Sequence, residues 1–255
     1  MLLCVDIGNT NIVLGVFQDD NLSHSFRLQC NLMQTADEYG TQIIEILRFY
    51  QIDYLSVKAV IISSVVPGLD RTFEKMAELY FKTKPLFVGP GTKSGIKIKL
   101  DNPKQLGADI LVGAVAAYYK YGAPAIIIDM GTAITFAYVN AEKELLGGII
   151  VPGIKTSFSN LVSKTSKLEE VRMDVPLRVI GRDTVASIQS GMIYGTASMI
   201  DGMIRKIKQD VNVDRAVVVI TGGEARMIMP FLEEKIIYDD HLLLDGLRLI
   251  YQKNQ

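Results

Sequence analysis

The sequence predicts a mixed α/β protein built from two related domains, and two observations predict it. First, a pattern of three successive strands followed by helices alternating with strands occurs near residue 2 and again near residue 124. Second, the two patterns begin with matching segments, LLCVDIGNTNIVLGVF at residues 2–17 and AIIIDMGTAITFAYVN at residues 125–140. Each has four apolar residues, an Asp, an apolar residue and a Gly before a second strand. We therefore expect two mixed sheets, each flanked by helices.

The first half of the chain carries clear turn and helix-start signals. Gly8-Asn9-Thr10 and Asp19-Asp20-Asn21 have the composition of turns between strands. A capping box at 35–38, Thr-Ala-Asp-Glu, predicts the start of a helix, and Pro67 predicts another. The strands expected around these signals are 2–6, 12–17, 22–28, 59–63 and 85–88.

The second half repeats this order. Strands are expected at 124–130, 133–139, 144–151 and 216–220, and helices from Asp183 to about Gln209, from near Gly222-Gly223, and at 243–253. The domain boundary is placed between residues 113 and 122, which gives domains 1–116 and 117–255. The sequence leaves open whether helix 243–253 packs back on the first domain.

Composition excludes several classes of function. The 255 residues include 27 basic and 28 acidic side chains, and 49% are hydrophobic, as in ordinary globular proteins. This balance calls for neither a nucleic-acid nor a membrane partner. Apolar runs such as Ala123–Met130 are too short to span a bilayer. The chain begins with a strand pattern and lacks a basic leader with a cleavage site, so we expect a cytoplasmic protein.

Cysteine and histidine are too sparse for zinc or thiol chemistry. Cys4 and Cys30 form no CxxC pair, and both histidines, His24 and His241, are far from either thiol in sequence. Any reaction must therefore use carboxylates, hydroxyls, backbone amides and metal ions.

The repeated turn has the chemistry of a nucleoside triphosphate site. Glycines at 8 and 131 let a backbone approach phosphates, and Asp6 is placed to face a metal ion. One such turn alone is also typical of a plain hairpin, but two at matching positions favour a shared function. The donors to phosphate oxygens would be Asn9, Thr10, Asn11 and Thr132.

A third segment, VVVITGGEA at residues 217–225, has a Gly pair where a strand ends, so adenine or ribose could lie against its backbone. An ordinary strand-to-helix turn has the same pattern.

Together these motifs resemble the actin, chaperone ATPase and sugar kinase superfamily, in which ATP sits in the cleft between two related domains. More specific segments are DIGNTN (6–11), ISSVVP (62–67), DNPKQLGAD (101–109), IDMGTAITF (128–136), LGGIIVPG (146–153), IGRDTVASIQSG (180–191) and TGGEA (221–225). These segments are similar to type III pantothenate kinase, in the same order and over nearly the whole chain. The resemblance implies two actin-like (ribonuclease H-like) domains with the active site in the cleft.

The resemblance also implies an activity and its site. The activity is ATP-dependent phosphorylation of pantothenate to 4′-phosphopantothenate, the first step of coenzyme A biosynthesis, with Mg²⁺ and a monovalent cation, K⁺ or NH₄⁺. It implies a homodimer with the pantothenate pocket near the interface. Asp109 corresponds to the catalytic base, Asp129 to the monovalent-cation ligand, and Asp6 meets Mg²⁺ through phosphates or water. The ATP contacts fall on Asp6, Ile7, Gly8, Asn9, Thr10, Asn11, Ile12, Val13 and Thr132, and the pantothenate contacts on Leu100, Gly107, Ala108, Asp109, Ile110 and Thr184.

The residues themselves allow these roles. Asp109 stands where a helix begins, and the helix dipole there favours an ionised carboxylate, although an ordinary helix-start charge looks the same. Asp183-Thr184 also begins a helix whose amides and hydroxyl could receive the carboxylate or amide of pantothenate, although N-capping explains Asp183 equally well.

One position departs from the family, whose Gly-Ala-Asp-Arg segment reads GADI here, with Ile110 in place of arginine. Losing a charged hydrogen bond costs about 1.5–3 kcal/mol. Lys104, Lys155 or Arg182 could supply the missing charge. Two alternatives therefore stay open: a nucleotide-binding regulatory homologue with weak or no kinase activity, and a superfamily kinase acting on a sugar or acetate. The pantothenate-type segments argue against the second.

Overall fold

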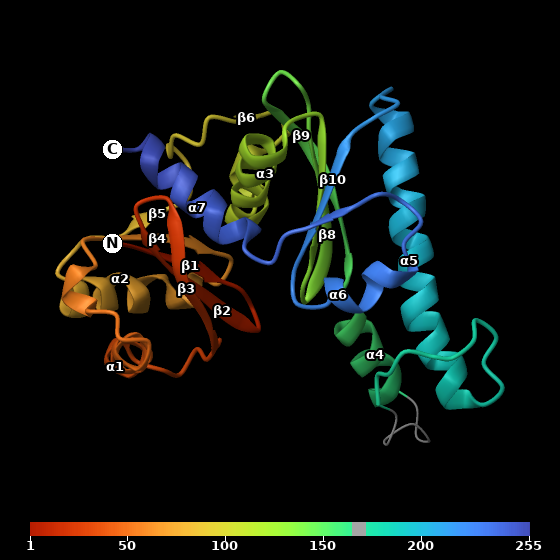
Figure 1. Cartoon of the computed structure of the whole chain (residues 1–255), viewed down its shortest axis with the longest axis horizontal. Helices are drawn as coiled ribbons and strands as arrows, with labels where there is room; N and C mark the ends of the chain where they lie inside the picture. The colour runs from red at the N-terminus through yellow and green to blue at the C-terminus, as the bar shows by residue number, and fades with distance from the viewer. Residues whose placement is uncertain (165–171) are drawn as a thin grey trace. The chain divides into compact units, whose positions relative to one another are not determined.

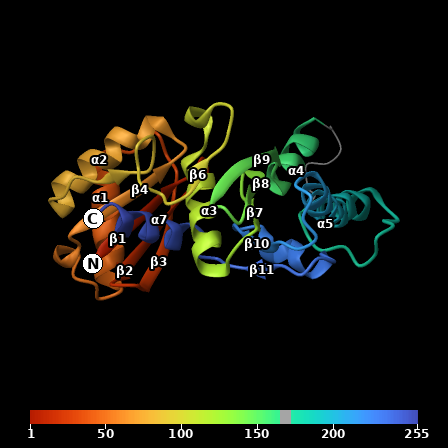
Figure 2. The ribbon, with the colours of Figure 1, turned by 90° about the horizontal axis from the view of Figure 1, so that it is seen from above.

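The computed structural model describes residues 1–164 and 172–255, which group into two compact units. The first unit contains Met1–Tyr119 and His241–Gln255, and the second contains Lys120–Asp240. The boundary expected from the sequence, between residues 116 and 117, lies three residues before the end of Met1–Tyr119. The packing of the C-terminal helix, which the sequence left open, is with the first unit. Figure 1 labels most helices and strands of both units, and Figure 2 also labels β7 and β11.

The first unit contains a mixed sheet with strand order β3-β2-β1-β4-β5. Strands β1, β2 and β3 form an antiparallel meander, whereas β4 runs parallel to β1 and β5 parallel to β4. The strands β1 and β2 are short, almost continuously buried apolar runs, and polar turns join the three strands of the meander. The strands are β1 (Leu2–Ile7), β2 (Asn11–Gln18), β3 (Asn21–Gln29), β4 (Ala59–Ser64) and β5 (Leu86–Phe87).

Helices cover both faces of this sheet. On one face Leu3, Val5 and Ile7 belong to a core that also holds buried residues of α1 (Ala36–Phe49) and α2 (Pro67–Phe81). On the other face α7 (Leu242–Lys253) packs against β1 and β4, as Figures 1 and 2 show. The remaining elements are η1 (Tyr54–Ser56), β6 (Lys97–Ile98), η2 (Pro103–Gln105) and α3 (Ala108–Tyr121).

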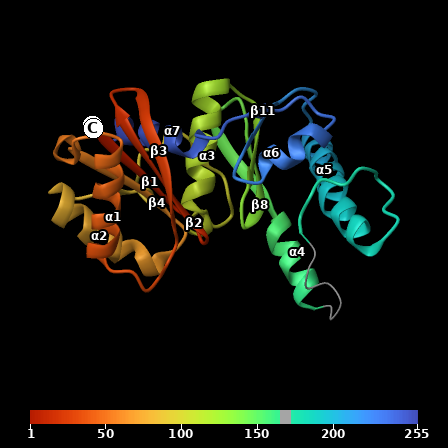
Figure 3. The same ribbon diagram turned by 60° about the horizontal axis from the view of Figure 1, so that its bottom comes forward.

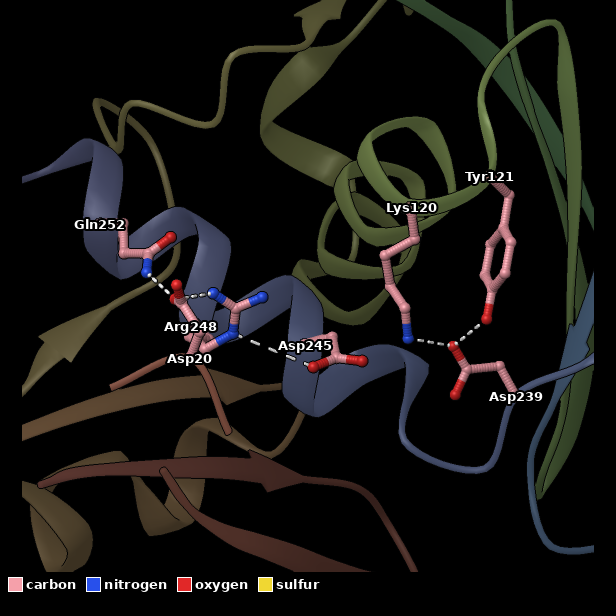
Figure 4. Close-up of polar contacts among 7 residues, drawn as sticks. All are labelled: Asp20, Lys120, Tyr121, Asp239, Asp245, Arg248 and Gln252. Carbon is pink, nitrogen blue, oxygen red and sulfur yellow. Dashed lines mark hydrogen bonds and ion pairs between the residues drawn. The ribbon is translucent and has the colours of Figure 1, made fainter. Parts of the chain in front are cut away.

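Polar contacts also attach α7 to the β2–β3 turn. Arg248 Nη1 lies 2.5 Å from Asp20 Oδ1, and Gln252 Nε2 donates to the same oxygen at 2.6 Å (Figure 4). The Arg248 guanidinium also lies over the Phe17 ring, 5.7 Å from its centroid. Because the Asp20 side chain is 72% exposed, the ion pair itself adds little, and apolar packing holds α7 in the first unit.

The second unit repeats the strand pattern of the first. Its strands lie in the order β11-β10-β7-β8-β9, with β7, β8 and β9 antiparallel and β10 and β11 parallel to their neighbours. Each strand thus has a counterpart in β1–β5, which confirms the internal repeat predicted from the matched segments. The strands are β7 (Ala125–Met130), β8 (Ala133–Val139), β9 (Glu144–Pro152), β10 (Val217–Thr221) and β11 (Ile237–Tyr238).

The long helix α5 (Thr184–Asp210) closes the core of the second unit. Its buried residues Ile193, Ala197 and Ile200 join a cluster with apolar residues of β7 and β10. Asp183 is its N-cap, accepting a hydrogen bond from the backbone N–H of Ala186 at 2.8 Å. Figure 3 shows α5 with α4 (Ile154–Ser163); α6 (Ala225–Ile228) and η3 (Met229–Phe231) complete the unit.

One buried carboxylate joins the two ends of the second unit. Asp239 Oδ2 lies 2.5 Å from Lys120 Nζ and accepts a hydrogen bond from the Tyr121 hydroxyl at 2.8 Å (Figure 4). These contacts connect the end of α3 with the residue that follows β11.

Most expected elements are confirmed, and four helices or strands differ from expectation. Helix α4 and the two-residue strands β6 and β11 were not expected, and the helix predicted near the Gly pair begins at Ala225 with four residues. The capping box is confirmed, since Glu38 accepts from the Thr35 N–H at 2.7 Å and donates its own N–H to Thr35 Oγ1. No helix in the described ranges is long and apolar enough to cross a membrane.

Candidate active site

The first predicted phosphate turn joins β1 to β2 and presents polar groups at its surface. The Gly8 N–H donates to Asn11 O at 3.0 Å, and a Cβ on Gly8 would stand only 3.1 Å from that oxygen. Asn9, Thr10 and Asn11 are exposed, and Asp6 at the end of β1 is half-buried. The turn therefore offers backbone N–H groups, amides and a hydroxyl, which are the donors that a phosphate needs.

Some members of this segment face inward. Ile7 and Ile12 pair across the turn and are fully buried in the core beneath α1 and α2, so any nucleotide contact they make must use backbone atoms. Val13 is half-buried and pairs with Asp6. Ser63 of β4 is the other register neighbour of Asp6; it is fully buried, and its hydroxyl has no hydrogen-bond partner within the described residues.

The second predicted phosphate turn joins β7 to β8 and is one residue shorter. Three residues separate the paired Met130 and Ile134, whereas four separate Ile7 and Ile12. Thr132 is exposed and Asp129 is half-buried.

This turn is tightly enclosed by neighbouring segments. Gly222 has a φ of +96°, and a Cβ there would overlap Met130 O and stand 2.6 Å from Asp129 Oδ1. The Thr132 carbonyl accepts two hydrogen bonds, from the Gly153 N–H at 3.0 Å and from Thr156 Oγ1 at 2.7 Å. Glycine is therefore required at 222 by both backbone conformation and close approach.

Asp109 lies in the first turn of α3 and is half-buried. Its Oδ1 accepts from the Ile110 N–H at 2.7 Å, and a Cβ on Gly107 would overlap that oxygen, so the glycine makes room for the carboxylate. Burial raises the pKa of Asp109, and backbone hydrogen bonds oppose this only in part. The helix dipole expected to favour the ionised form acts in the same direction as these hydrogen bonds. A carboxyl with a raised pKa is a better proton acceptor near neutral pH.

The predicted pantothenate contacts fall in both units. Leu100, Gly107, Ala108 and Ile110 are half-buried in the first unit, whereas Thr184 is exposed at the start of α5 in the second. The three cations considered as replacements for arginine are all exposed: Lys104, Lys155 and Arg182. Only Lys104 belongs to the same unit as Ile110.

The structure also draws attention to a residue that sequence reasoning passed over. Glu224 follows the Gly pair and is 7% exposed, and its Oε2 accepts from the Ile154 N–H at 3.0 Å. Burial raises its pKa. The sequence signal for this residue was its place in TGGEA, directly after a buried strand and a Gly pair. A carboxylate that is buried there needs a hydrogen-bond donor.

A nucleotide-bound Mg²⁺ fits the donors of the first turn. No three His, Cys, Asp or Glu side chains gather as a metal site within residues 1–164 and 172–255. Mg²⁺ held with a nucleotide takes one or two carboxylates and completes its shell with phosphate and water oxygens. The half-buried side chain of Asp6 has the chemistry of such a carboxylate ligand.

Comparison with known proteins gives consistent results. The family model for type III pantothenate kinase matches residues 2–206. A type III pantothenate kinase from Syntrophus aciditrophicus (strain SB) is 43% identical over 254 residues, which covers all of both chains.

Two solved structures show the fold alone. Component A of (R)-2-hydroxyglutaryl-CoA dehydratase from Acidaminococcus fermentans has a TM-score of 0.60 at 14% identity, covering 98% of this chain and 96% of its own. The activator of 2-hydroxyisocaproyl-CoA dehydratase from Clostridium difficile, solved with bound ADPNP, has a TM-score of 0.56 at 12% identity, covering 99% and 96%. The chain thus has the actin-like ATPase and sugar kinase fold.

Proposed function

The chain belongs to the type III pantothenate kinase family, and we propose that Asp109 is the base of its reaction. The enzyme transfers the terminal phosphoryl group of ATP to pantothenate in coenzyme A biosynthesis. As the pantothenate hydroxyl oxygen bonds to phosphorus, the bond to ADP breaks and the hydroxyl proton passes to the Asp109 carboxylate. The observation that carries this role is a half-buried carboxylate with a raised pKa in a space that Gly107 leaves open.

ATP is held, in this proposal, by residues 6–13 and Thr132. Exposed polar groups at Asn9, Thr10 and Asn11 support the assignment, while Ile7 and Ile12 contribute backbone atoms only. Mg²⁺, carried in with ATP and met by Asp6, would neutralise charge on the phosphates.

Asp129 is the proposed ligand of a monovalent cation, K⁺ or NH₄⁺. Its half-buried carboxylate lies at the end of β7, beside Gly222 and one residue from the carbonyl of Met130. Oxygen ligands of this kind suit hard cations.

Pantothenate is proposed to contact Leu100, Gly107, Ala108, Ile110 and Thr184. Because isoleucine offers no charge at 110, Lys104 on the same unit is the cation we assign to the carboxylate of the substrate. We also propose that the enzyme is a cytoplasmic homodimer that binds small molecules and neither nucleic acid nor a membrane.

A substrate panel tests this proposal. The chain is incubated with ATP, Mg²⁺ and K⁺ together with pantothenate, glucose or acetate, and ADP release is followed with each acceptor. We expect turnover with pantothenate alone, a several-fold rise in the pantothenate KM for Lys104→Ala, and no change for the matched control Lys58→Ala, which is also exposed in the first unit. Turnover of glucose or acetate in place of pantothenate would contradict the proposed acceptor. An unchanged KM in Lys104→Ala would contradict the role of Lys104 alone.

A further inference from the structure

We propose that Glu224 is a positioning residue for ATP, because its buried carboxylate holds the start of α4 against the β7–β8 turn. The inference rests on the proposed role of Thr132 in binding phosphate. Glu224 itself is not assigned a contact with the nucleotide.

Glu224 connects three segments of the second unit. Its side chain accepts from the Ile154 N–H at 3.0 Å and also from the Lys155 N–H, both at the start of α4. Its own N–H donates to Met130 O at 3.3 Å, at the end of β7. Because Glu224 follows the Gly pair directly, it joins that turn to both α4 and β7.

Helix α4 needs this acceptor. Its N-cap residue is Gly153, which has no side chain to receive the first N–H groups of the helix. A carboxylate at this end also interacts favourably with the helix dipole. Glu224 therefore acts as a cap supplied from 70 residues away in sequence.

The start of α4 in turn holds the backbone of the predicted phosphate turn. Thr132 O accepts from the Gly153 N–H at 3.0 Å and from Thr156 Oγ1 at 2.7 Å. The fit is close, since a Cβ on Gly153 would overlap Gly131 O and stand 2.8 Å from Thr132 O. A shift of α4 would therefore move the peptide groups on both sides of Thr132.

Asp201 provides a matched control for the loss of a buried carboxylate. It is 3% exposed in α5 and accepts from the N–H groups of Glu233 and Glu234 at 3.0 and 3.2 Å. Like Glu224, it satisfies two backbone donors at a distant segment. These two donors lie outside the β7–β8 turn.

The experiment compares Glu224→Ala, Glu224→Gln and Asp201→Ala by steady-state kinetics, at a temperature well below the melting point of each. We expect Glu224→Ala to raise the KM for ATP about tenfold, with a smaller change in kcat, because two N–H donors lose their acceptor. Glu224→Gln keeps an acceptor oxygen and should restore most of the affinity. Asp201→Ala should lower the melting temperature without changing the KM for ATP.

Two results would overturn the inference: an unchanged KM in Glu224→Ala, or an equal rise in Asp201→Ala. Thr132→Ala separates this failure from that of the proposed function. If Thr132→Ala raises the KM and Glu224→Ala does not, only the inference about Glu224 is wrong. If neither does, the phosphate role of the turn is wrong as well. Titration with a non-hydrolysable ATP analogue gives the same comparison for any variant that turns over too slowly.

Discussion

Replacing Asp109 with asparagine should abolish most of the activity without weakening the fold. Loss of a general base commonly lowers kcat by about 10²–10⁴, or about 2.7–5.4 kcal/mol in the barrier. The asparagine oxygen still accepts from the Ile110 N–H, which the carboxylate receives at 2.7 Å. Burial raises the pKa of Asp109, so the ionised carboxylate destabilises the folded state above that pKa. The folded state loses about 1.4 kcal/mol of stability for each unit by which the pKa of Asp109 in the folded state exceeds its pKa in the unfolded state. The variant should therefore be at least as stable as the parent at pH 8.

The sign of the pH dependence gives a second check. As pH falls through the raised pKa, protonation relieves the buried charge, so the parent gains stability relative to Asp109→Asn. Coupled ADP release measures kcat, and thermal melting at pH 8 and at acidic pH measures stability. The exposed Asp101→Asn serves as the control. The reasoning is refuted if Asp109→Asn keeps kcat within tenfold of the parent, or if it melts well below the parent at pH 8.

Further predictions concern pH, the glycine turn, the arginine position and the monovalent ion. The acid limb of kcat/KM should lie above the ordinary pKa of an aspartate, because the proposed base Asp109 accepts a proton only when ionised, and Asp109→Asn should lack that limb. Gly222→Ala should lower the free energy of unfolding by more than about 1 kcal/mol and weaken ATP binding, because φ at this position is +96° and the added Cβ would overlap Met130 O. Gly191→Ala, which has open space around the added Cβ, is the control for both measurements. Ile110→Arg should lower the KM for pantothenate about tenfold or more, and an unchanged or higher KM would argue against an anion site there. Replacing K⁺ with a bulky organic cation should abolish turnover in the parent, whereas Asp129→Asn should respond little to either ion.

Local patterns predicted most of this fold from the sequence. Short apolar runs, turn residues and the Thr35–Glu38 capping box each involve only a few neighbouring residues, and the structure confirms the elements that they indicate. The matched segments around Asp6 and Asp129 predicted the internal repeat for the same reason. The glycines and polar side chains of each turn are neighbours in the sequence, so they could be recognised without knowing the fold.

Features that depend on distant partners were missed. Helix α4 begins at a glycine and receives its cap from Glu224, so no N-cap signal exists near residue 153. Strand β11 has two residues and exists through its pairing with β10. The packing of α7 on β1 also could not be predicted, because an amphipathic helix does not reveal which sheet it covers.

The balance at Asp109 shows the same limit. The sequence placed it at a helix start, where the dipole favours the ion, but desolvation depends on the surrounding packing. In the structure burial raises the pKa of Asp109 more than its backbone hydrogen bonds lower it, which makes the residue a better candidate for a base.

The most direct measurement follows the phosphoryl group itself. ATP carrying ¹⁸O in its terminal phosphoryl group is mixed with enzyme, Mg²⁺, K⁺ and pantothenate, and the products are resolved by mass spectrometry. The account predicts that the labelled group appears on pantothenate in the same amount as ADP, and that Asp109→Asn forms this product far more slowly. Release of the label as inorganic phosphate, with pantothenate unchanged, would contradict it.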